Sequence, residues 1–373
     1  MTGIDGGRRE HPGADDGGRR GQAGAEWDDD RRMLAAVRRV CGGRLVAVTA
    51  VLVVLLVTFA VLALMLGDRV LPPGDVFAAL VGQGSGGDRF VVLGLRLPRL
   101  VLAVLVGAAF GLAGAVFQSL LGNPLASPDI IGISQGASAA AVGAILLLGW
   151  SGLAVSFAAF AGAVLVAALI TVLASRHGMA GSRFVLIGIA LAFLAQAAIG
   201  YLLTRADVRD AQAALVWLVG SLGTVQPEEI AVMAIAGVVL ALGLALLAPR
   251  LRMLQLGDEA AAALGVRVVP TRLLLTLVAV GLAAVATAAA GPVAFVAFVS
   301  APIARRLLGG GTRGGAALVT SALVGAVVVS GADIVAQHGL PGLQVPVGIV
   351  TGVVGAPILL ALLARGNRMR GAA

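Results

Sequence analysis

The chain has 373 residues, of which 59% are hydrophobic and only 12% charged, and its mean hydropathy is +1.01. Because a soluble domain carries about 25% charged residues, this composition excludes an ordinary soluble protein. Alternating strand patterns are absent, which argues against a membrane β-barrel. The sequence is rich in Ala, Val, Leu and Gly, and small residues let helices approach closely. We therefore expect an all-α polytopic membrane protein built as a tight helix bundle.

The basic residues exclude two further classes. All 27 are arginines, and the chain contains no lysine. A phosphate-binding P-loop needs Gly-Lys-Ser/Thr, so any ATP used in transport must be hydrolysed by another chain. The arginines lie mainly between apolar runs, where they set membrane orientation and do not indicate nucleic-acid binding. Cys41 is the single cysteine, which excludes an intrachain disulfide and a thiolate metal site.

Residues 1–43 are rich in Gly, Asp and Arg without an apolar period, which predicts a disordered cytoplasmic N-terminal tail. Residues 44–373 are expected to form one transmembrane domain. The apolar run Leu45–Leu66 is close to the roughly 20 residues needed to span a bilayer. Arginines precede this run, so its N-terminal side is expected in the cytoplasm.

The segment Asp68–Leu95 is predicted to be an external loop. It contains Gly82–Gly87 with the spacing GxGxxG. No strand precedes this pattern and no compact nucleotide-binding domain surrounds it, so we expect no nucleotide to bind there.

The stretch from Arg96 to Gly136 is the most informative part of the sequence. An apolar helix over Leu97–Leu121 is followed by Pro124 and Pro128, and a second helix is predicted over Asp129–Trp150. Broken backbone and polar side chains at membrane depth are tolerated only where protein or a water-filled cavity covers them. The polar side chains in this stretch are Gln118, Asn123, Ser127, Asp129, Ser134 and Gln135. We therefore expect packed, pathway-lining structure here.

The remaining apolar runs predict helices over Leu153–Ala174, Phe184–Thr204, Ile230–Ala248, Leu273–Ala290, Phe295–Leu308, Ala316–Gln337 and Val345–Leu363. The total is about ten helices, the eighth of them short, with both termini in the cytoplasm. In each half an arginine-led helix is followed by a proline-broken segment, and inverted repeats of this kind mark transport folds. The connection Arg205–Glu229 is predicted to be external.

A polar stretch at about residues 250–272 separates the sixth and seventh predicted helices. Its middle predicts a short Ala-rich helix with acids in the first turn, where the helix dipole favours them. It is too short and too polar to span a membrane, so we expect it to project from the cytoplasmic face towards a partner protein. The residues that define it are Leu256, Gly257, Asp258, Glu259, Leu264 and Gly265.

Several motifs occur in a fixed order along the chain. They are Arg-Leu-Pro-Arg at 96–99, Asn-Pro-Leu-Ala-x-Pro at 123–128, Ile-Gly-Ile-Ser-x-Gly-Ala at 131–137, Trp-x-x-Gly-Ser-Leu at 217–222 and Gly-Pro-Val-Ala-Phe at 291–295. Together they resemble the membrane permeases of ATP-driven importers for iron-siderophores, haem and vitamin B12. The resemblance covers about residues 96–363. Many members have Pro-His followed by Ile-x-Arg where this chain has Ala301-Pro302 before Ile303 and Arg305, so no role is carried over from that histidine.

The resemblance implies the bundle of a type II importer permease in the cytoplasmic membrane of a bacterium. Its partners would be two ATPase subunits, an extracytoplasmic substrate-binding protein and a second permease chain, identical or related. A permease does no covalent chemistry, so we expect no catalytic residue and no cofactor bound by this chain. Iron would travel inside its chelator, so we also expect no protein metal ligands. The segment Leu256–Val266 resembles the family's ATPase-coupling segment, and an ordinary connector is the alternative.

Three amides, Gln118, Asn123 and Gln135, either line the translocation path or hold helices together by hydrogen bonds. Asp333 lies near the external end of the ninth helix, where the family often has an acid. It either contacts the cargo or has a structural partner.

The external mouth is assigned to Arg96 and Arg99, with Trp217 nearby. By resemblance the two arginines serve docking or the pathway, and interfacial snorkelling is the alternative. The pairs of glycines spaced four apart, such as Gly107 and Gly111, are expected to pack helices within the chain, with dimerisation or gating as the alternative.

The function that we expect is translocation of a ferric siderophore by alternating access. Vitamin B12 or haem is the alternative within the family. An ion-coupled secondary transporter is a second alternative, which requires functional carboxylates within the membrane, and Asp333 is the serious candidate. A structural or receptor membrane protein is the third.

Overall fold

The computed structural model describes residues 42–175, 181–223, 226–309, 315–340 and 343–370, and in these ranges all regular structure is helical. The chain divides into two units, Met1–Ala47 and Val48–Ala373. Only residues 42–47 of the first unit are described, so the fold below is that of the second. Cys41 and all but the last two residues of the expected tail lie outside the described residues.

The first described helix covers Gly42–Met65. The others, in chain order, are α2 (Pro73–Leu80), α3 (Gly86–Arg89), a π-helix (Phe90–Arg96), α4 (Leu97–Leu121), α5 (Ile133–Leu148), α6 (Leu153–Ser175), α7 (Gly181–Arg205), α8 (Val208–Val219), α9 (Pro227–Leu254), α10 (Asp258–Ala263), α11 (Val268–Ala290), α12 (Val296–Leu307), α13 (Gly315–His338) and α14 (Val347–Arg370).

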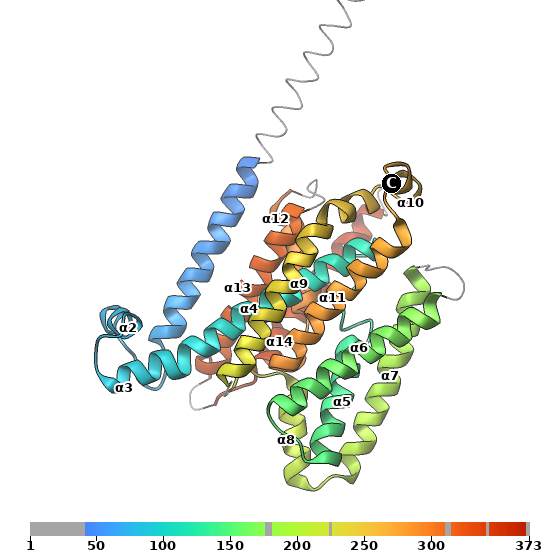
Figure 1. Cartoon of the computed structure of the whole chain (residues 1–373). Helices are drawn as coiled ribbons and strands as arrows, with labels where there is room; N and C mark the ends of the chain where they lie inside the picture. The colour runs from blue at the N-terminus through green and yellow to red at the C-terminus, as the bar shows by residue number, and fades with distance from the viewer. Residues whose placement is uncertain (1–41, 176–180, 224–225, 310–314, 341–342, 371–373) are drawn as a thin grey trace, which may run out of the picture. The chain divides into compact units, whose positions relative to one another are not determined.

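Helix α4 is the centre of the larger unit, and α9, α11, α12 and α13 pack against it (Figure 1). Its glycines allow this. A Cβ atom added to Gly107 would lie 2.3 Å from the carbonyl oxygen of Gly325, and one on Gly111 would lie 2.2 Å from that of Ser321. Both oxygens belong to α13, and such separations exclude any side chain. The Gly107–Gly111 pair is therefore a packing face within the chain, which is the role favoured from the sequence.

Helices α5, α6, α7 and α8 form a second group (Figure 1). Helix α5 packs against the other three, and α11 contacts both α5 and α6, which joins this group to the central helices. Glycine again sets the spacing, because a Cβ atom on Gly162 of α6 would lie 2.4 Å from the carbonyl oxygen of Gly136 in α5.

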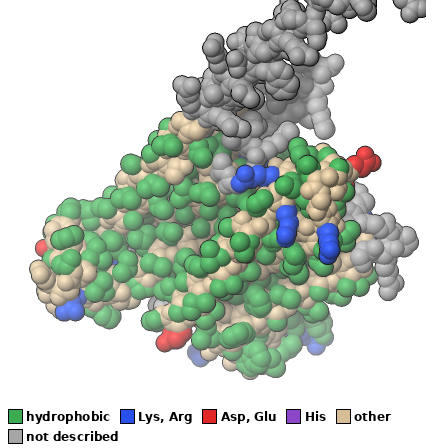
Figure 2. Space-filling view, turned by 45° about the horizontal axis from the view of Figure 1, so that its top comes forward, with side chains coloured by type: hydrophobic (Ala, Val, Ile, Leu, Met, Phe, Trp, Pro, Cys, Tyr) green, Lys and Arg blue, Asp and Glu red, His purple; other side chains and the backbone are tan. Residues whose placement is uncertain are grey.

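Within the described residues, seven helices are long and apolar enough to cross a membrane. They are Gly42–Met65, the continuous helix Gly86–Leu121, and the helices of α6, α7, α9, α11 and α13. The other three expected positions hold α5, the apolar part of α14 and the 12-residue α12. Each of the ten predicted regions therefore contains a helix. The face in Figure 2 is largely hydrophobic, as expected for helices that meet lipid.

The prediction of an external loop over Asp68–Leu95 was wrong. Helices α2 and α3 form within it, and α3 continues through the π-helix into α4, so that one helix runs over Gly86–Leu121. The start is fixed by Ser85, whose side-chain oxygen accepts a hydrogen bond from the backbone N–H of Asp88. A serine at this position satisfies a free donor of the first turn.

Several other boundaries differ from the prediction, and α11, for example, begins at Val268 and not at Leu273. The expected external connection Arg205–Glu229 contains the 12-residue helix α8. Helix α9 continues beyond the expected end at Ala248 to Leu254, although Pro249 lies inside it. A proline removes one backbone hydrogen bond, but Leu251 and Leu254 are buried and their packing holds the last turns in place.

Candidate functional sites at the two ends of the bundle

Helices α4 and α13 run in opposite directions, which gives the bundle two distinct ends. At one, called here the α2 end, α4 begins and α13 finishes, and Arg99 meets Asp333. At the other, called the α10 end, α4 finishes and α13 begins, so that Gln118 and Ala317 line one cavity. The residues singled out from the sequence divide between these two ends.

At the α2 end, Asp333 is almost fully buried and has a charged partner. The Arg99 Nη2 donates to Oδ1 at 2.8 Å, and Nε donates to Oδ2 at 3.1 Å. Gln337 Nε2 adds a hydrogen bond to Oδ2 at 2.7 Å. A buried carboxylate needs such compensation, because removing it from water costs several kcal/mol. The structural partner that the sequence left open for Asp333 is therefore Arg99.

Arg96, also expected at the external mouth, uses its guanidinium group to bind backbone carbonyl oxygens. Its guanidinium donates to the carbonyl oxygens of Leu64 at 2.7 Å, Met65 at 3.0 Å and Arg69 at 2.6 Å. The last carbonyl groups of a helix have no partner within it. Arg96 thus caps the helix Gly42–Met65 and fixes the turn that follows.

A cavity of about 500 Å³ opens beside these groups at the α2 end. Its lining includes Arg96, Arg99 and Asp333, together with His338 and Gln344. The sequence predicted three of these residues, and the structure brings them together.

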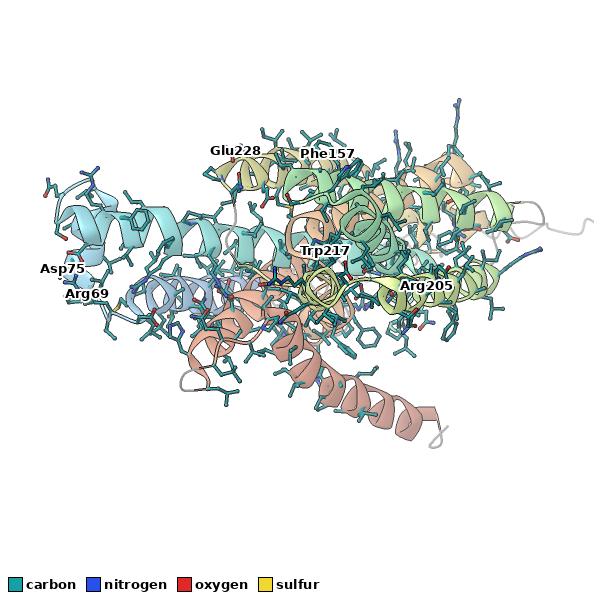
Figure 3. The ribbon with its side chains drawn as sticks, turned by 90° about the horizontal axis from the view of Figure 1, so that it is seen from below. Arg69, Asp75, Phe157, Arg205, Trp217 and Glu228 are labelled. Carbon is teal, nitrogen blue, oxygen red and sulfur yellow. The ribbon has the colours of Figure 1, made fainter. Side chains whose placement is uncertain are left out.

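Trp217 lies on α8 and lines a second cavity of the α2 end, of about 380 Å³, with Trp150 and Glu229. Seen from below in Figure 3, Trp217 lies near the middle of the unit, with Arg69 and Arg205 towards opposite sides. The half-buried Glu229 was missed from the sequence. Its signal was the spacing Gln226-x-x-Glu229, which forms a capping box at the start of α9.

At the α10 end, Gln118 is buried and joins α4 to α12. Its Nε2 donates to the carbonyl oxygen of Phe298 at 3.0 Å, and its Oε1 accepts from Nη2 of Arg305. The amide therefore holds helices together, one of the two roles left open for it. It also lines a cavity of about 620 Å³, and its role in lining the translocation path stays a prediction.

The segment between α4 and α5 is fixed by local turns. The Oδ1 of Asn123 accepts from the backbone N–H of Leu125 at 2.9 Å, which forms a turn and leaves the side chain exposed. Ser134 donates to Asp129 Oδ1 at 2.5 Å. Burial raises the pKa of the Asp129 carboxyl, and the Ser134 hydrogen bond opposes part of that shift. Gln135 is half-buried on α5, and among the described residues the hydrogen-bond partners of Gln118 are Phe298 and Arg305, not Gln135.

The short helix expected at 256–266 is present as α10, Asp258–Ala263. Gly257 precedes it with φ of 105° and Gly265 follows it with φ of 82°, values that favour glycine. Asp258 and Glu259 stand in its first turn, and Asp258 Oδ1 accepts from Arg272 Nη2 at 2.7 Å. The flanking leucines are largely exposed, Leu256 at 67% and Leu264 at 58%. The two exposed leucines that flank α10 form an apolar surface to which another protein can bind.

The chemistry of these sites is that of binding and packing. Across the described parts of the chain there is no group of three or more His, Cys, Asp and Glu that could hold a metal ion. Arg99 and Arg305 meet other side chains, Arg96 meets backbone carbonyls, and most of the residues that line the two cavities are uncharged.

The model of the FecCD transport family matches residues 54–365. The chain is 38% identical to the ferric enterobactin transport system permease protein FepG of Escherichia coli, over 88% of this chain and 98% of that protein. It is 34% identical to the vitamin B12 import system permease protein BtuC of Citrobacter koseri, over 84% and 93%. A solved transporter assigned to the metal-chelate ABC type, in an inward-facing conformation, aligns with a TM-score of 0.74 at 27% identity, over 87% of this chain and 99% of that one.

Proposed function

Since the chain belongs to the FecCD transport family, we propose that it is the permease subunit of an ATP-driven importer that carries a ferric siderophore through the cytoplasmic membrane of a bacterium. The observation that carries the proposal is the similarity to a ferric enterobactin permease, which extends over 88% of this chain. The chain transports by alternating access and does no covalent chemistry.

The two ends of the bundle have different partners. The α10 end faces the cytoplasm, because arginines of short connections are enriched on that side of a membrane, and Arg250, Arg252, Arg267 and Arg306 lie there. Figure 2 shows several basic side chains in the upper right part of a mainly apolar face, and further basic and acidic side chains at its lower and left edges. Two ATPase subunits dock at this end, one on the α10 helix of each of two paired permease chains. ATP and Mg²⁺ bind to the ATPase, and this chain holds no cofactor.

The α2 end faces outward and receives the cargo from a substrate-binding protein. Arg99, Asp333 and Gln344 form a polar rim there, and Trp217 lies beside a neighbouring cavity. Iron passes inside its chelator, so the chain needs to recognise the chelate and not the bare ion. A lining of mostly uncharged groups suits a pathway that has to release its cargo.

Uptake of labelled ferric siderophores, with labelled cobalamin in parallel, tests the proposal in cells with and without the gene. Loss of ferric-siderophore uptake, restored by the gene, is the expected result. Loss of cobalamin uptake alone would replace the cargo and keep the architecture. Vitamin B12 is a concrete alternative cargo, because the chain is 34% identical to a vitamin B12 permease and 38% identical to a ferric enterobactin permease.

Ion-coupled secondary transport predicts that Asp333 carries protons, so that Asp333→Asn abolishes uptake. The ion pair with Arg99 gives Asp333 a structural role instead. We expect Asp333→Asn to retain vanadate-sensitive uptake per molecule of permease, with less permease in the membrane. Full abundance without any uptake would favour ion coupling.

Copurification with the ATPase tests the assignment of α10. Gly265→Trp forces a large residue into a backbone with φ of 82°, which distorts the end of α10 although the space around it is open. Leu264→Glu leaves the backbone alone and places a charge on the exposed surface. Both are expected to lose the ATPase, whereas Leu340→Glu, an exposed leucine at the opposite end, is expected to keep it.

A further inference from the structure

A cavity of about 620 Å³ at the α10 end lies between α4, α9, α11, α12 and α13. The charged side chains that line it are both arginines, Arg272 from α11 and Arg305 from α12. Gln118, Ser119 and Gln255 supply further polar atoms. A cavity that contains two guanidinium groups and no lining carboxylate attracts anions.

The charge of Arg305 is not neutralised within the described residues. Its Nη2 donates to Oε1 of Gln118, which is an amide oxygen without a charge. No carboxylate of the described chain forms an ion pair with it. Arg305 is half-buried, so water screens its charge only in part.

Arg272 leaves a donor unused as well. Its Nη2 binds Asp258 at 2.7 Å, but its Nε is buried and has no hydrogen-bond partner. A buried donor without an acceptor is unfavourable, because it has lost its hydrogen bonds to water. Asp258 is the one carboxylate that these two arginines meet among the described residues, and its side chain is 54% exposed. The cavity thus keeps an excess positive charge, and one of its two arginines has a donor without an acceptor.

We propose that this cavity binds an oxyanion of the phosphate or carboxylate class, held by Arg272 and Arg305. Guanidinium groups present their N–H donors in a planar fork that matches both anions, and such charge-assisted hydrogen bonds are about twice as strong as neutral ones. The ligand supplies the counter-charge that Arg305 lacks among the described residues.

Two sources can supply this chemistry. One is free inorganic phosphate from the cytoplasm, and the other is an acidic side chain of the ATPase that docks beside α10. The second source rests on the proposed function, whereas the anion site itself is a property of this chain alone. An oxyanion at this position connects α11 to α12 and, through Gln118, to α4. It therefore stabilises one arrangement of the helices next to the coupling segment.

Equilibrium binding of radiolabelled inorganic phosphate to the purified full chain in lipid nanodiscs tests the site. We expect saturable binding at constant ionic strength, weakened at least tenfold by Arg272→Gln and by Arg305→Gln. Arg306→Gln is the matched control, because Arg306 is the exposed neighbour of Arg305 and does not line the cavity. Its affinity is expected to stay within a factor of two.

Arg272→Gln decides the result if Arg305→Gln fails to fold, because the side-chain partner of Arg272 is the exposed Asp258 and not a residue of α4. A chain that binds no phosphate, or an Arg306→Gln variant that loses as much affinity as Arg272→Gln, overturns the proposal. Adding the ATPase then separates the sources. Displacement of phosphate by the ATPase, with weaker ATPase binding in Arg272→Gln, identifies an acidic side chain. Phosphate that stays bound with the ATPase present identifies the free ion. If cells lacking the gene take up siderophores normally, the proposed function fails while phosphate binding can still be measured.

Discussion

Arg99, in the first turn of α4, and Arg305, which contacts Gln118 near the other end of α4, have different partners for their charges. At the α2 end, Asp333 accepts three hydrogen bonds from Arg99 and one from Gln337. At the α10 end, Gln118 offers Arg305 a neutral amide oxygen. The first arginine has a counter-charge of its own, and the second has an acceptor but no counter-charge among the described residues.

The difference separates a fixed contact from a responsive one. An ion pair that is complete within the chain holds α4 to α13 in every state that keeps the helices together. A cation without a counter-ion depends on what enters from outside, so its energy changes when a ligand or a partner arrives. The α10 end, where we place the ATPase, is therefore the end whose stability changes when a ligand or partner binds. The ion pair at the α2 end keeps the external mouth in a fixed arrangement.

Both ends depend on the close packing of α4, so replacing a glycine between them is expected to have the largest effect on stability. A Cβ atom on Gly114 would lie 1.8 Å from the carbonyl oxygen of Ala297 in α12. We expect Gly114→Leu to destabilise the fold by about 3 kcal/mol or more, because backbone cannot yield as a flexible side chain does. The measurement is the yield of monodisperse protein after detergent extraction.

Gly143→Leu in α5 is the control for that variant, because nothing lies within 4 Å of its added Cβ. Near-normal yield is expected. Equal losses in the two variants would show that the cost is not one of close packing.

The ion pair at the α2 end gives the next largest effect. Asp333→Ala leaves Arg99 without its charge partner, and breaking a buried pair on one side costs about 3–5 kcal/mol. The Arg99 side chain is 22% exposed, so we expect about 2–3 kcal/mol, since water relieves part of the penalty. Chemical unfolding of the purified chain measures it.

The double variant Arg99→Met with Asp333→Leu removes both charges and is expected to recover most of that stability. A double variant as unstable as Asp333→Ala would mean that the pair contributes more than mutual neutralisation, and would contradict the view of the α2 end as a closed electrostatic contact.

Two substitutions at Gln118 test how the charge of Arg305 is met at the α10 end of α4. Gln118→Leu removes the acceptor of Arg305 and the donor to Phe298, and we expect a cost of about 1–3 kcal/mol. Gln118→Glu supplies the counter-charge that Asp333 provides at the other end. Its stability is expected to remain within about 1 kcal/mol of the original, since a stronger contact with Arg305 offsets the lost donor to Phe298.

Binding of phosphate distinguishes these two variants from each other. The carboxylate introduced by Gln118→Glu competes with an incoming anion, so affinity for phosphate is expected to fall at least tenfold, whereas Gln118→Leu retains Arg305 as a cation and retains binding. Tight phosphate binding by Gln118→Glu would contradict the inference that the unmet charge of Arg305 recruits the ligand.

The sequence was sufficient to predict where the helices lie, because apolar length and glycine spacing are local properties. It predicted the end of α4 at Leu121, and it predicted α10 with its acidic first turn. It failed over Asp68–Leu95 and Arg205–Glu229, where polar and small residues suggested loops. There, the cap at Ser85 and the packing of α8 on α5 hold helices that hydropathy alone does not indicate.

The sequence did not predict which side chains from distant segments pair with each other. Arg99 and Asp333 were both selected, but they are 234 positions apart and nothing local links them. Arg96 looked like a free mouth residue, although its side chain caps the preceding helix. Arg305 was noted only within a motif, and its uncompensated charge becomes visible once Gln118 is seen to be its partner.

The smallest expected effect comes from Asp258, the exposed carboxylate that pairs with Arg272. Exposed ion pairs contribute about 0.2–1 kcal/mol, so Asp258→Asn should change the free energy of unfolding by less than about 1 kcal/mol. The same change frees Arg272 Nη2 for an incoming anion, and we expect phosphate affinity to rise by a factor of about two to five, which corresponds to that energy. Glu259→Gln, which removes a charge from the same turn without a contact to Arg272, is the control and should leave affinity nearly unchanged. Weaker phosphate binding in Asp258→Asn would mean that Asp258 positions Arg272 for the ligand instead of competing with it, and the responsive end would then include α10 itself.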